Sequence, residues 1–433
     1  MSPSRPGPWR TTLVAGMASY IDAGAIVTFG IAIVVYQQVF DLTPAQVGIA
    51  SGVLTFGIAI GAIVGGRLGD RFGRRPVFTV TMVLIIIGII ALVVAPSYEL
   101  ILGGAALLGL ATGADLPVSL STISEAASDD NRGKLLGFSN ILWACGVLFS
   151  TVLSVFVGDL GRMGGQILFA HIGAVALVVM IARLGIPESQ TWLDARTERS
   201  RGVHTIRADR AGVTRLLRSP YAVPFIGLIV FYALVNLAAN TSGQFTTYLL
   251  VNFAGVNVST ASIVGLFIAP LNFLSYFWFM RIADGRHRFR YFTIGAILWV
   301  SGLVVVAVFG LSIVTYLIAA GLAAIGMGFA FETIMKVWSQ QSFPTLLRTT
   351  AQGTIISVAR VFAAILASAT PAIAALGPSV LYTVLAVLVA IGMVVAWVTF
   401  RTRDRESQFV VEDQDNPTGA VSAVELQPLL PGQ

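Results

Sequence analysis

The chain has 433 residues, of which 56% are hydrophobic and 11% are charged, and its mean hydropathy is +0.84. Soluble globular domains carry about 25% charged residues, so this composition excludes a water-exposed globule and indicates a protein whose solvent is lipid. The net charge of +6 does not indicate a nucleic-acid partner, because most of the basic residues fall on loops of one membrane face, where topology and contact with anionic membrane lipids explain them. One cysteine, Cys145, and three scattered histidines predict neither an internal disulfide nor a metal site.

Twelve apolar segments are each long enough to cross about 30 Å of hydrocarbon at ~1.5 Å per residue. They predict an all-α membrane protein with twelve transmembrane helices in two pseudo-symmetric six-helix bundles. In chain order the segments are 11–37, 46–66, 77–95, 99–124, 135–157, 166–184, 222–251, 259–280, 291–310, 313–340, 349–376 and 379–400.

The basic residues predict which membrane face each loop occupies. Of the 27 Lys and Arg residues, 24 fall on loops that share a side with the N-terminus, Arg162 falls on the opposite side, and Lys336 and Arg360 lie inside spans. Loops rich in Lys and Arg stay cytoplasmic, so both termini are predicted to be cytoplasmic. Arg greatly outnumbers Lys, which suggests a GC-rich bacterial genome, and we expect the protein in a bacterial cytoplasmic (inner) membrane.

The spans divide the chain into four parts. Residues 1–184 are predicted to form the N-terminal bundle and residues 222–400 the C-terminal bundle. Residues 185–221, which carry seven arginines, are expected to be a cytoplasmic linker, and residues 401–433 a disordered cytoplasmic tail. We take a monomer as the default state.

The segment 65–76, GGRLGDRFGRRP, is a tight turn between the second and third spans. Its four arginines must stay on the cytoplasmic face, and its glycines let the two helix ends approach closely. A motif similar to the one around Asp70 recurs around Asp284, 214 residues later. A motif similar to the one around Glu125 recurs around Gln341, 216 residues later. Two motifs with nearly the same offset indicate an internal repeat.

Charged residues also lie deep inside the predicted spans. Helix rise places Asp22, Asp115, Glu332 and Arg360 ~14 to 18 Å from the cytoplasmic boundary, near the midplane. Lys336 follows Glu332 by one helical turn, so an i,i+4 ion pair is available. A charge at the bilayer centre costs at least ~2.5 to 3.5 kcal/mol unless it meets water or a partner, so these five residues predict a shared central cavity.

Asp22 and Asp115 are the candidates for proton coupling. A buried carboxylate away from cations can exchange a proton with water when a cavity opens. Neither acid has an evident cation in its own half, which favours at least one of them being protonated, as a pair that shares a proton. The alternative is that each is a structural carboxylate satisfied by nearby hydroxyls such as Ser19, Ser119 or Thr112.

The remaining midplane charges have two interpretations each. Glu332 and Lys336 either neutralise one another and lock their helix, or contact substrate. Arg360 either completes a network with Glu332 or faces the cavity as a fixed positive charge for an anionic substrate. Amides and aromatic side chains on neighbouring spans are suited to recognise hydroxyl or carboxylate groups and to stack on rings; the candidates are Asn140, Trp143, Asn236, Asn240, Gln244 and Tyr248.

The string GRLGDRFGRR resembles the loop between helices 2 and 3 of the major facilitator superfamily, and it matches at every fixed position. Three further strings resemble signatures of the sugar-porter branch and its organic-ion relatives: IPESQTWL after the sixth span, SEAASDDNRGKL after the fourth and SFPTLLRTTAQG after the tenth. YIDAG places Asp22 where sugar porters carry an acid implicated in proton coupling, while TGADLPVS around Asp115 is closer to organic-ion and phosphate symporters. The resemblance implies cytoplasmic gating by Asp70, Arg71, Arg74, Arg75, Glu125, Arg132, Asp284 and Arg348.

Within those gating contacts, Asp70 is expected near a helix N-terminus, with Glu125 and Arg132 bridging helices.

Departures from the sugar-porter pattern make a hexose a poor fit. Asn240 stands where a sugar-ligating glutamine would be, and the tryptophan that stacks on sugar is displaced, with Lys336 near its place and Trp338 two residues on.

We therefore expect a proton-coupled symporter that imports a small polar metabolite by alternating access, with an organic acid favoured over a sugar or polyol because of Lys336 and Arg360. The proton gradient is the energy source, and no cofactor is expected. One alternative is a proton-driven efflux antiporter of the same fold, and another is a non-transporting ligand sensor. An enzyme is not expected, because no nucleophile, base and orienting group occur together in a recognisable set.

Overall fold

The computed structural model describes residues 7–126, 132–189, 193, 216–282, 286–343 and 345–404. Asp284 lies outside the described residues, as do the side chains of Asp70, Arg132, Asn140 and Arg348.

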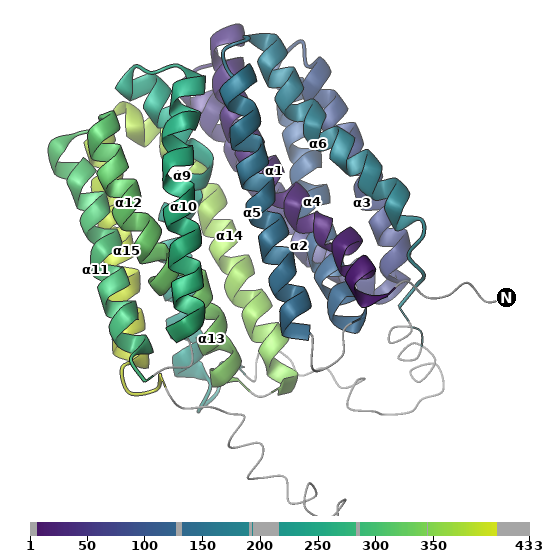
Figure 1. Ribbon diagram of the computed structural model, residues 1–433, viewed down its shortest axis with the longest axis vertical. Helices are drawn as coiled ribbons and strands as arrows, with labels where there is room; N and C mark the ends of the chain where they lie inside the picture. Colours follow the sequence, from purple (N-terminus) through teal and green to yellow (C-terminus); the bar gives the residue numbers. More distant parts are fainter. Residues whose placement is uncertain are drawn as a thin grey trace, which may run out of the picture.

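Every regular element in the described ranges is a helix, which confirms the expected all-α fold. Eleven helical stretches are long and apolar enough to cross a membrane, and a twelfth, Ile141–Val157, is shorter. Figure 1 shows α1–α6 (purple to blue) packed beside α9–α15 (teal to yellow). The helices are α1 (Pro8–Phe40), α2 (Pro44–Phe72), α3 (Arg74–Val94), α4 (Tyr98–Ala126), α5 (Arg132–Val157), α6 (Arg162–Arg183), α9 (Ala222–Ala254), α10 (Val258–Ile282), α11 (Arg288–Phe309), α12 (Ile313–Ala330), α13 (Glu332–Ser342), α14 (Thr345–Ala375) and α15 (Pro378–Phe400).

Successive spans run in opposite directions, so the molecule has two distinct ends. The turn at Gly73 lies at the same end as the start of α1 and the ends of α4 and α6, and we call this the α2–α3 end. The opposite end, which carries the α1–α2 and α5–α6 turns, is called the α1–α2 end.

The tenth predicted span, 313–340, is not one continuous helix. It breaks at Phe331, whose backbone (φ −129°, ψ −121°) is not helical, so that α12 ends before it and α13 begins at Glu332. The Phe331 ring stacks on Tyr232 and meets Trp299 edge-on, and the Thr333 hydroxyl donates to the Gly328 carbonyl. Aromatic packing therefore holds the break, and a side chain satisfies a carbonyl near it, as the membrane interior requires.

Small residues allow α2 and α4 to pack at very short distance. Gly57, Gly61 and Gly65 of α2 face Gly109 and Gly113 of α4, and a methyl group on any of them would clash with the backbone of the other helix. This arrangement is the small-xxx-small packing of membrane helices. It fixes α4, which carries Asp115, against α2.

The two halves of the chain touch each other at the α1–α2 end. Ser154 of α5 donates to Ser262 of α10 at 2.7 Å. Asp159, just after α5, accepts from the Asn257 side chain at 2.7 Å and from the Ser259 backbone at the start of α10. These contacts join the two halves at the α1–α2 end.

Candidate functional site

Asp22 lies in the middle of α1 and faces the other half of the molecule. Its side chain is 1% exposed, and Arg360 of α14 approaches it with 3.9 Å between Nη2 and Oδ2. Neither carboxylate oxygen has a hydrogen-bond partner within the described residues. The guanidinium of Arg360 and the indole of Trp143 are the potential donors that face it. A buried acid held this loosely is suited to bind and release a proton.

Glu332 and Lys336 form the predicted ion pair, with 2.7 Å between Oε1 and Nζ. Glu332 is the first residue of α13, where a negative charge is favoured by the helix dipole. Their side chains stay 45% and 33% exposed although they lie inside a span. Glu332 is within electrostatic reach of both Asp22 and Arg360, so the pair borders the space between the halves.

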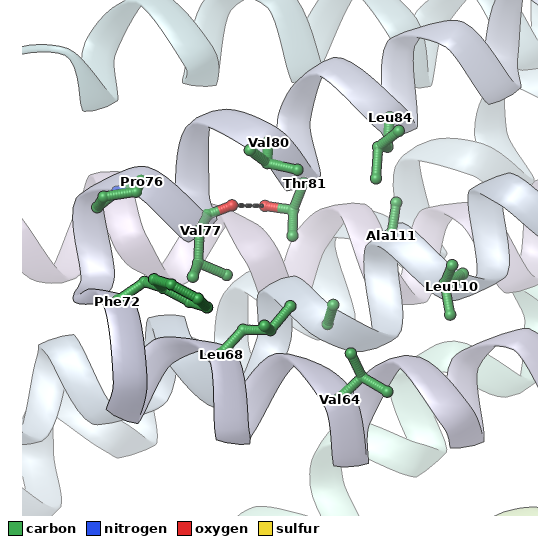
Figure 2. A pocket seen from close by; sticks show the side chains of 11 residues that line it. Val64, Leu68, Phe72, Pro76, Val77, Val80, Thr81, Leu84, Leu110 and Ala111 are labelled. Atoms are coloured by element: carbon green, nitrogen blue, oxygen red, sulfur yellow. Dashed lines mark hydrogen bonds between the residues drawn. The ribbon is translucent and has the colours of Figure 1, made fainter.

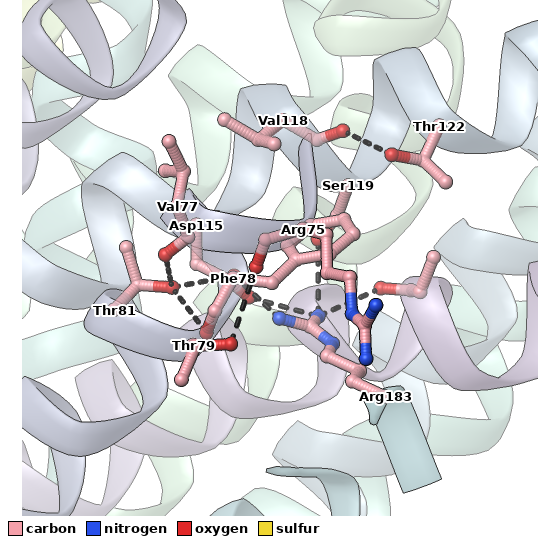
Figure 3. A network of polar contacts seen from close by, with 11 residues as sticks. Arg75, Val77, Phe78, Thr79, Thr81, Asp115, Val118, Ser119, Thr122 and Arg183 are labelled. Atoms are coloured by element: carbon pink, nitrogen blue, oxygen red, sulfur yellow. Dashed lines mark hydrogen bonds and ion pairs between the residues drawn. The ribbon is translucent and has the colours of Figure 1, made fainter. Parts of the chain in front are cut away.

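Asp115 does not share that space, and the expectation that it has no cation in its own half is wrong. Arg183, the last residue of α6, binds its two oxygens at 2.5 and 3.0 Å. Thr81 of α3 donates to the same carboxylate, and Arg183 also donates to Ser119 (Figure 3). The long arginine side chain reaches back from the helix end into the bundle. A proton shared between Asp22 and Asp115 therefore has no support, because both Asp115 oxygens are occupied.

This buried cluster ties four helices of the N-terminal half together. Besides Asp115 on α4 and Thr81 on α3, Arg183 donates to the Ala15 carbonyl of α1 and lies over the Phe78 ring at 4.3 Å. Arg183 is 4% exposed and Asp115 is 1% exposed.

The polar residues of α9 divide into two groups. Asn236 and Asn240 are half-buried, and Asn236 lies close to the Tyr232 hydroxyl. Gln244 is buried against α2, where it donates to the Ser51 carbonyl and accepts from Thr55. Tyr248 is buried among apolar side chains. In this conformation, Gln244 therefore belongs to the interface with α2 and Tyr248 to the core, and neither contacts the charged residues around Asp22.

Two tyrosines that were not predicted as site residues complete this region. Tyr232 of α9 and Tyr276 of α10 both lie within electrostatic reach of Glu332. Their depth within the spans could have identified them from the sequence. Tyrosines in membrane proteins concentrate at the membrane–water interfaces, so a tyrosine deep in a span is unusual.

Two of the predicted gating residues, Arg74 and Glu125, form a polar clamp at the α2–α3 end. Arg74 pairs with Glu125 at 2.7 Å. Glu188, just beyond α6, accepts from the backbone N–H groups of Arg74 and Arg75, and so it caps α3. Glu188 thus supplies a carboxylate to this helix N-terminus, and the place of Asp70 near a helix N-terminus stays a prediction, because its side chain lies outside the described residues.

A second clamp repeats this pattern in the C-terminal half. Arg288 pairs with Asp404 at 3.0 Å and donates to Gln341 at 3.1 Å. Arg288, Gln341 and Asp404 follow Arg74, Glu125 and Glu188 by 214, 216 and 216 residues, respectively.

Trp338 belongs to this second clamp rather than to the substrate site. It stacks on Phe400 with 4.2 Å between ring centroids, and its indole donates to Asp404 at 2.7 Å.

Eleven candidate membrane spans and a shorter apolar helix in the described part of the chain, with charged side chains from α1, α13 and α14 meeting between the two halves, define a multi-pass secondary transporter. The comparison with known families agrees: the model of the Major Facilitator Superfamily matches residues 11–368. The chain belongs to this superfamily, which is a family of transporters and not of enzymes.

Individual relatives place the chain in the sugar-porter-like branch. It is 31% identical over 359 residues to the minor myo-inositol transporter IolF of Bacillus subtilis, covering 81% of each chain. It is 25% identical over 413 residues to the inner membrane metabolite transport protein YgcS of Escherichia coli, covering 88% of each. Among solved structures, a D-xylose–proton symporter matches with a TM-score of 0.74 and 18% identity, covering 90% of this chain and 97% of that one. This last likeness concerns the fold. The protein is a metabolite transporter.

Proposed function

We propose that the transporter imports a neutral polyhydroxylated compound, of the chemical class of inositol, together with a proton. The observation that carries this proposal is the charge balance of the site. Asp22 lies close to Arg360, and Glu332 forms an ion pair with Lys336. These four charges cancel, so neither cation is left over for a carboxylate ligand. The preference for an organic acid rested on the two cations alone, and it has no support once their partners are counted.

The uncharged groups around this site suit a polyol. The amides of Asn236 and Asn240 can each donate to and accept from a hydroxyl, as can the phenol of Tyr232. Trp143 is 43% exposed and offers an apolar face to a ring. The name of the Bacillus subtilis relative, a myo-inositol transporter, supports the same substrate class.

For the proton, we assign Asp22 as the sole carrier in the N-terminal half. Asp115 is held by Arg183, Thr81 and Ser119 in a closed cluster, whereas the oxygens of Asp22 have no hydrogen-bond partner among the described residues. One carrier corresponds to one proton per transport cycle. The proton symporter among the structural neighbours is consistent with coupling of this kind.

Transport would follow from rocking of the two halves around this site. By the distribution of Lys and Arg, the α2–α3 end is assigned to the cytoplasm, so the contacts at the α1–α2 end close the site toward the outside. Ionised Asp22 attracts Arg360 across the interface between the halves. A proton on Asp22 removes that attraction and permits the loaded carrier to reorient.

The test is uptake of radiolabelled myo-inositol into proteoliposomes under an inward proton gradient. Unlabelled cyclic polyols should compete with it, whereas benzoate and succinate at the same concentration should not. Competition by carboxylates equal to that by polyols would overturn the substrate class. Uptake that is indifferent to the proton gradient would overturn the coupling and leave the substrate class standing.

A further inference from the structure

An apolar groove runs along the outer side of the N-terminal half, where α2 and α3 diverge over α4 (Figure 2). Its walls are Val64, Leu68 and Phe72 of α2 and Val80 and Leu84 of α3, and Ala111 of α4 lies in its floor. The eleven lining residues include a single hydroxyl, that of Thr81.

The Thr81 hydroxyl turns away from the groove. It is hydrogen-bonded to the Val77 carbonyl and to the Asp115 carboxylate, so the groove offers no polar group to a ligand along its length. Val64 to Phe72 on α2 and Pro76 to Leu84 on α3 each span eight residue steps, or ~12 Å of helix. The groove therefore accommodates a stretch of extended hydrocarbon chain.

Positive charge lies at the end of this groove. The guanidinium of Arg71 stands 5.2 Å from the centroid of the Phe72 ring, which lines the groove. Arg75 at the start of α3 is also exposed, but its guanidinium donates to the Leu184 carbonyl just beyond α6, so Arg71 supplies the charge at the groove. Both arginines lie at the α2–α3 end, where the chain leaves the apolar span. An apolar channel that ends beside an arginine is complementary to a lipid with an anionic headgroup.

We propose that this groove is a binding site for one anionic phospholipid. An acyl chain lies between α2 and α3, and the phosphate group pairs with Arg71. The wall of the groove at Thr81 backs directly onto the Asp115–Arg183 pair, so a bound chain keeps water away from that buried pair. The lipid thereby strengthens the cluster that joins α1, α3, α4 and α6.

Native mass spectrometry of delipidated, detergent-purified protein tests the site. Phosphatidylglycerol and phosphatidylcholine with identical acyl chains serve as the probes. The expected result is one preferred phosphatidylglycerol adduct, bound more tightly than phosphatidylcholine by roughly fivefold, because Arg71 contacts the headgroup.

Two pairs of variants separate the chain site from the headgroup site. Val80→Trp fills the groove and should abolish the adduct, whereas Val83→Trp, on an exposed part of α3 outside the groove, should leave it unchanged. Arg71→Gln should reduce the preference for phosphatidylglycerol by roughly fivefold. Arg290→Gln should not; Arg290 is an exposed arginine near the start of α11, also at the α2–α3 end of the molecule.

The melting temperature supplies an independent readout. Added phosphatidylglycerol should raise it for the wild type and for Val83→Trp but not for Val80→Trp. Equal binding of both lipids by the wild type, or an unchanged adduct in Val80→Trp, would overturn the proposal.

Discussion

Arg360 of the C-terminal half lies 3.9 Å from Asp22 of the N-terminal half, so an ion pair links the two bundles at the site. The other midplane acid of the N-terminal half, Asp115, has its cation within the same bundle. Only the first of these pairs joins bodies that must move relative to each other during transport. This difference in location separates a pair that can respond to protons during the cycle from a pair that holds the scaffold.

The scaffold role of Asp115 predicts a loss of stability rather than a loss of coupling. Asp115→Asn leaves the buried Arg183 charge without its counter-ion, and removal of one partner from a buried pair costs about 3 to 5 kcal/mol. Thermal unfolding of the purified protein should show a clearly lower melting temperature. Asp22→Asn is the matched control and should lower the melting temperature less, because the Asp22 oxygens hold no hydrogen bond to a described residue and Arg360 is 3.9 Å away and partly exposed. Equal melting temperatures for wild type and Asp115→Asn would contradict the assignment.

The charge balance of the site predicts a change in ligand selectivity. Glu332→Gln removes one negative charge and leaves Lys336 unpaired, so carboxylates such as benzoate should begin to inhibit polyol uptake. The double variant Glu332→Gln, Lys336→Met restores neutrality and should lose that inhibition again. Competition assays in proteoliposomes measure both effects. If benzoate inhibits neither variant, the two residues do not set the charge of the substrate site.

The contact between Ser154 and Ser262 predicts a cross-link that arrests transport. Their hydroxyl oxygens are 2.7 Å apart, close enough for cysteines at these positions to form a disulfide after a small adjustment. In a Cys145→Ser background, which removes the only native cysteine, the double variant Ser154→Cys, Ser262→Cys should lose nearly all uptake on oxidation and regain it on reduction.

Each single cysteine variant is the control and should be indifferent to oxidant. A cross-linked protein that still transports would show that the α1–α2 end does not need to open.

Sequence reasoning succeeded where a feature depends on spacing along one helix. The lengths of apolar runs predicted the all-helical fold, and the i,i+4 relation predicted the pair of Glu332 and Lys336. The repeat offset also related Glu125 to Gln341, and both residues contact equivalent arginines, Arg74 and Arg288.

Features that depend on side-chain reach or on packing between helices were missed. Arg183 ends α6, and counting charges by membrane face treats such a residue as part of a loop, although its side chain extends back to Asp115. The helix breaks at Phe331, and neither Phe331 nor its two neighbours are proline or glycine. The break depends instead on packing of the Phe331 ring against Tyr232 and Trp299. Gln244 resembled a ligand-binding amide, but it bonds to α2 because the two halves meet there.

The measurement that tests the central claim most directly is the accumulation of labelled myo-inositol in proteoliposomes across a range of imposed proton gradients. If Asp22 is the only coupling acid, the accumulation ratio of the wild type should grow in proportion to the proton gradient, with one proton per substrate. The Asp22→Asn variant should equilibrate the substrate without concentrating it. Gradient-driven accumulation by Asp22→Asn, or a stoichiometry of two protons in the wild type, would contradict the account.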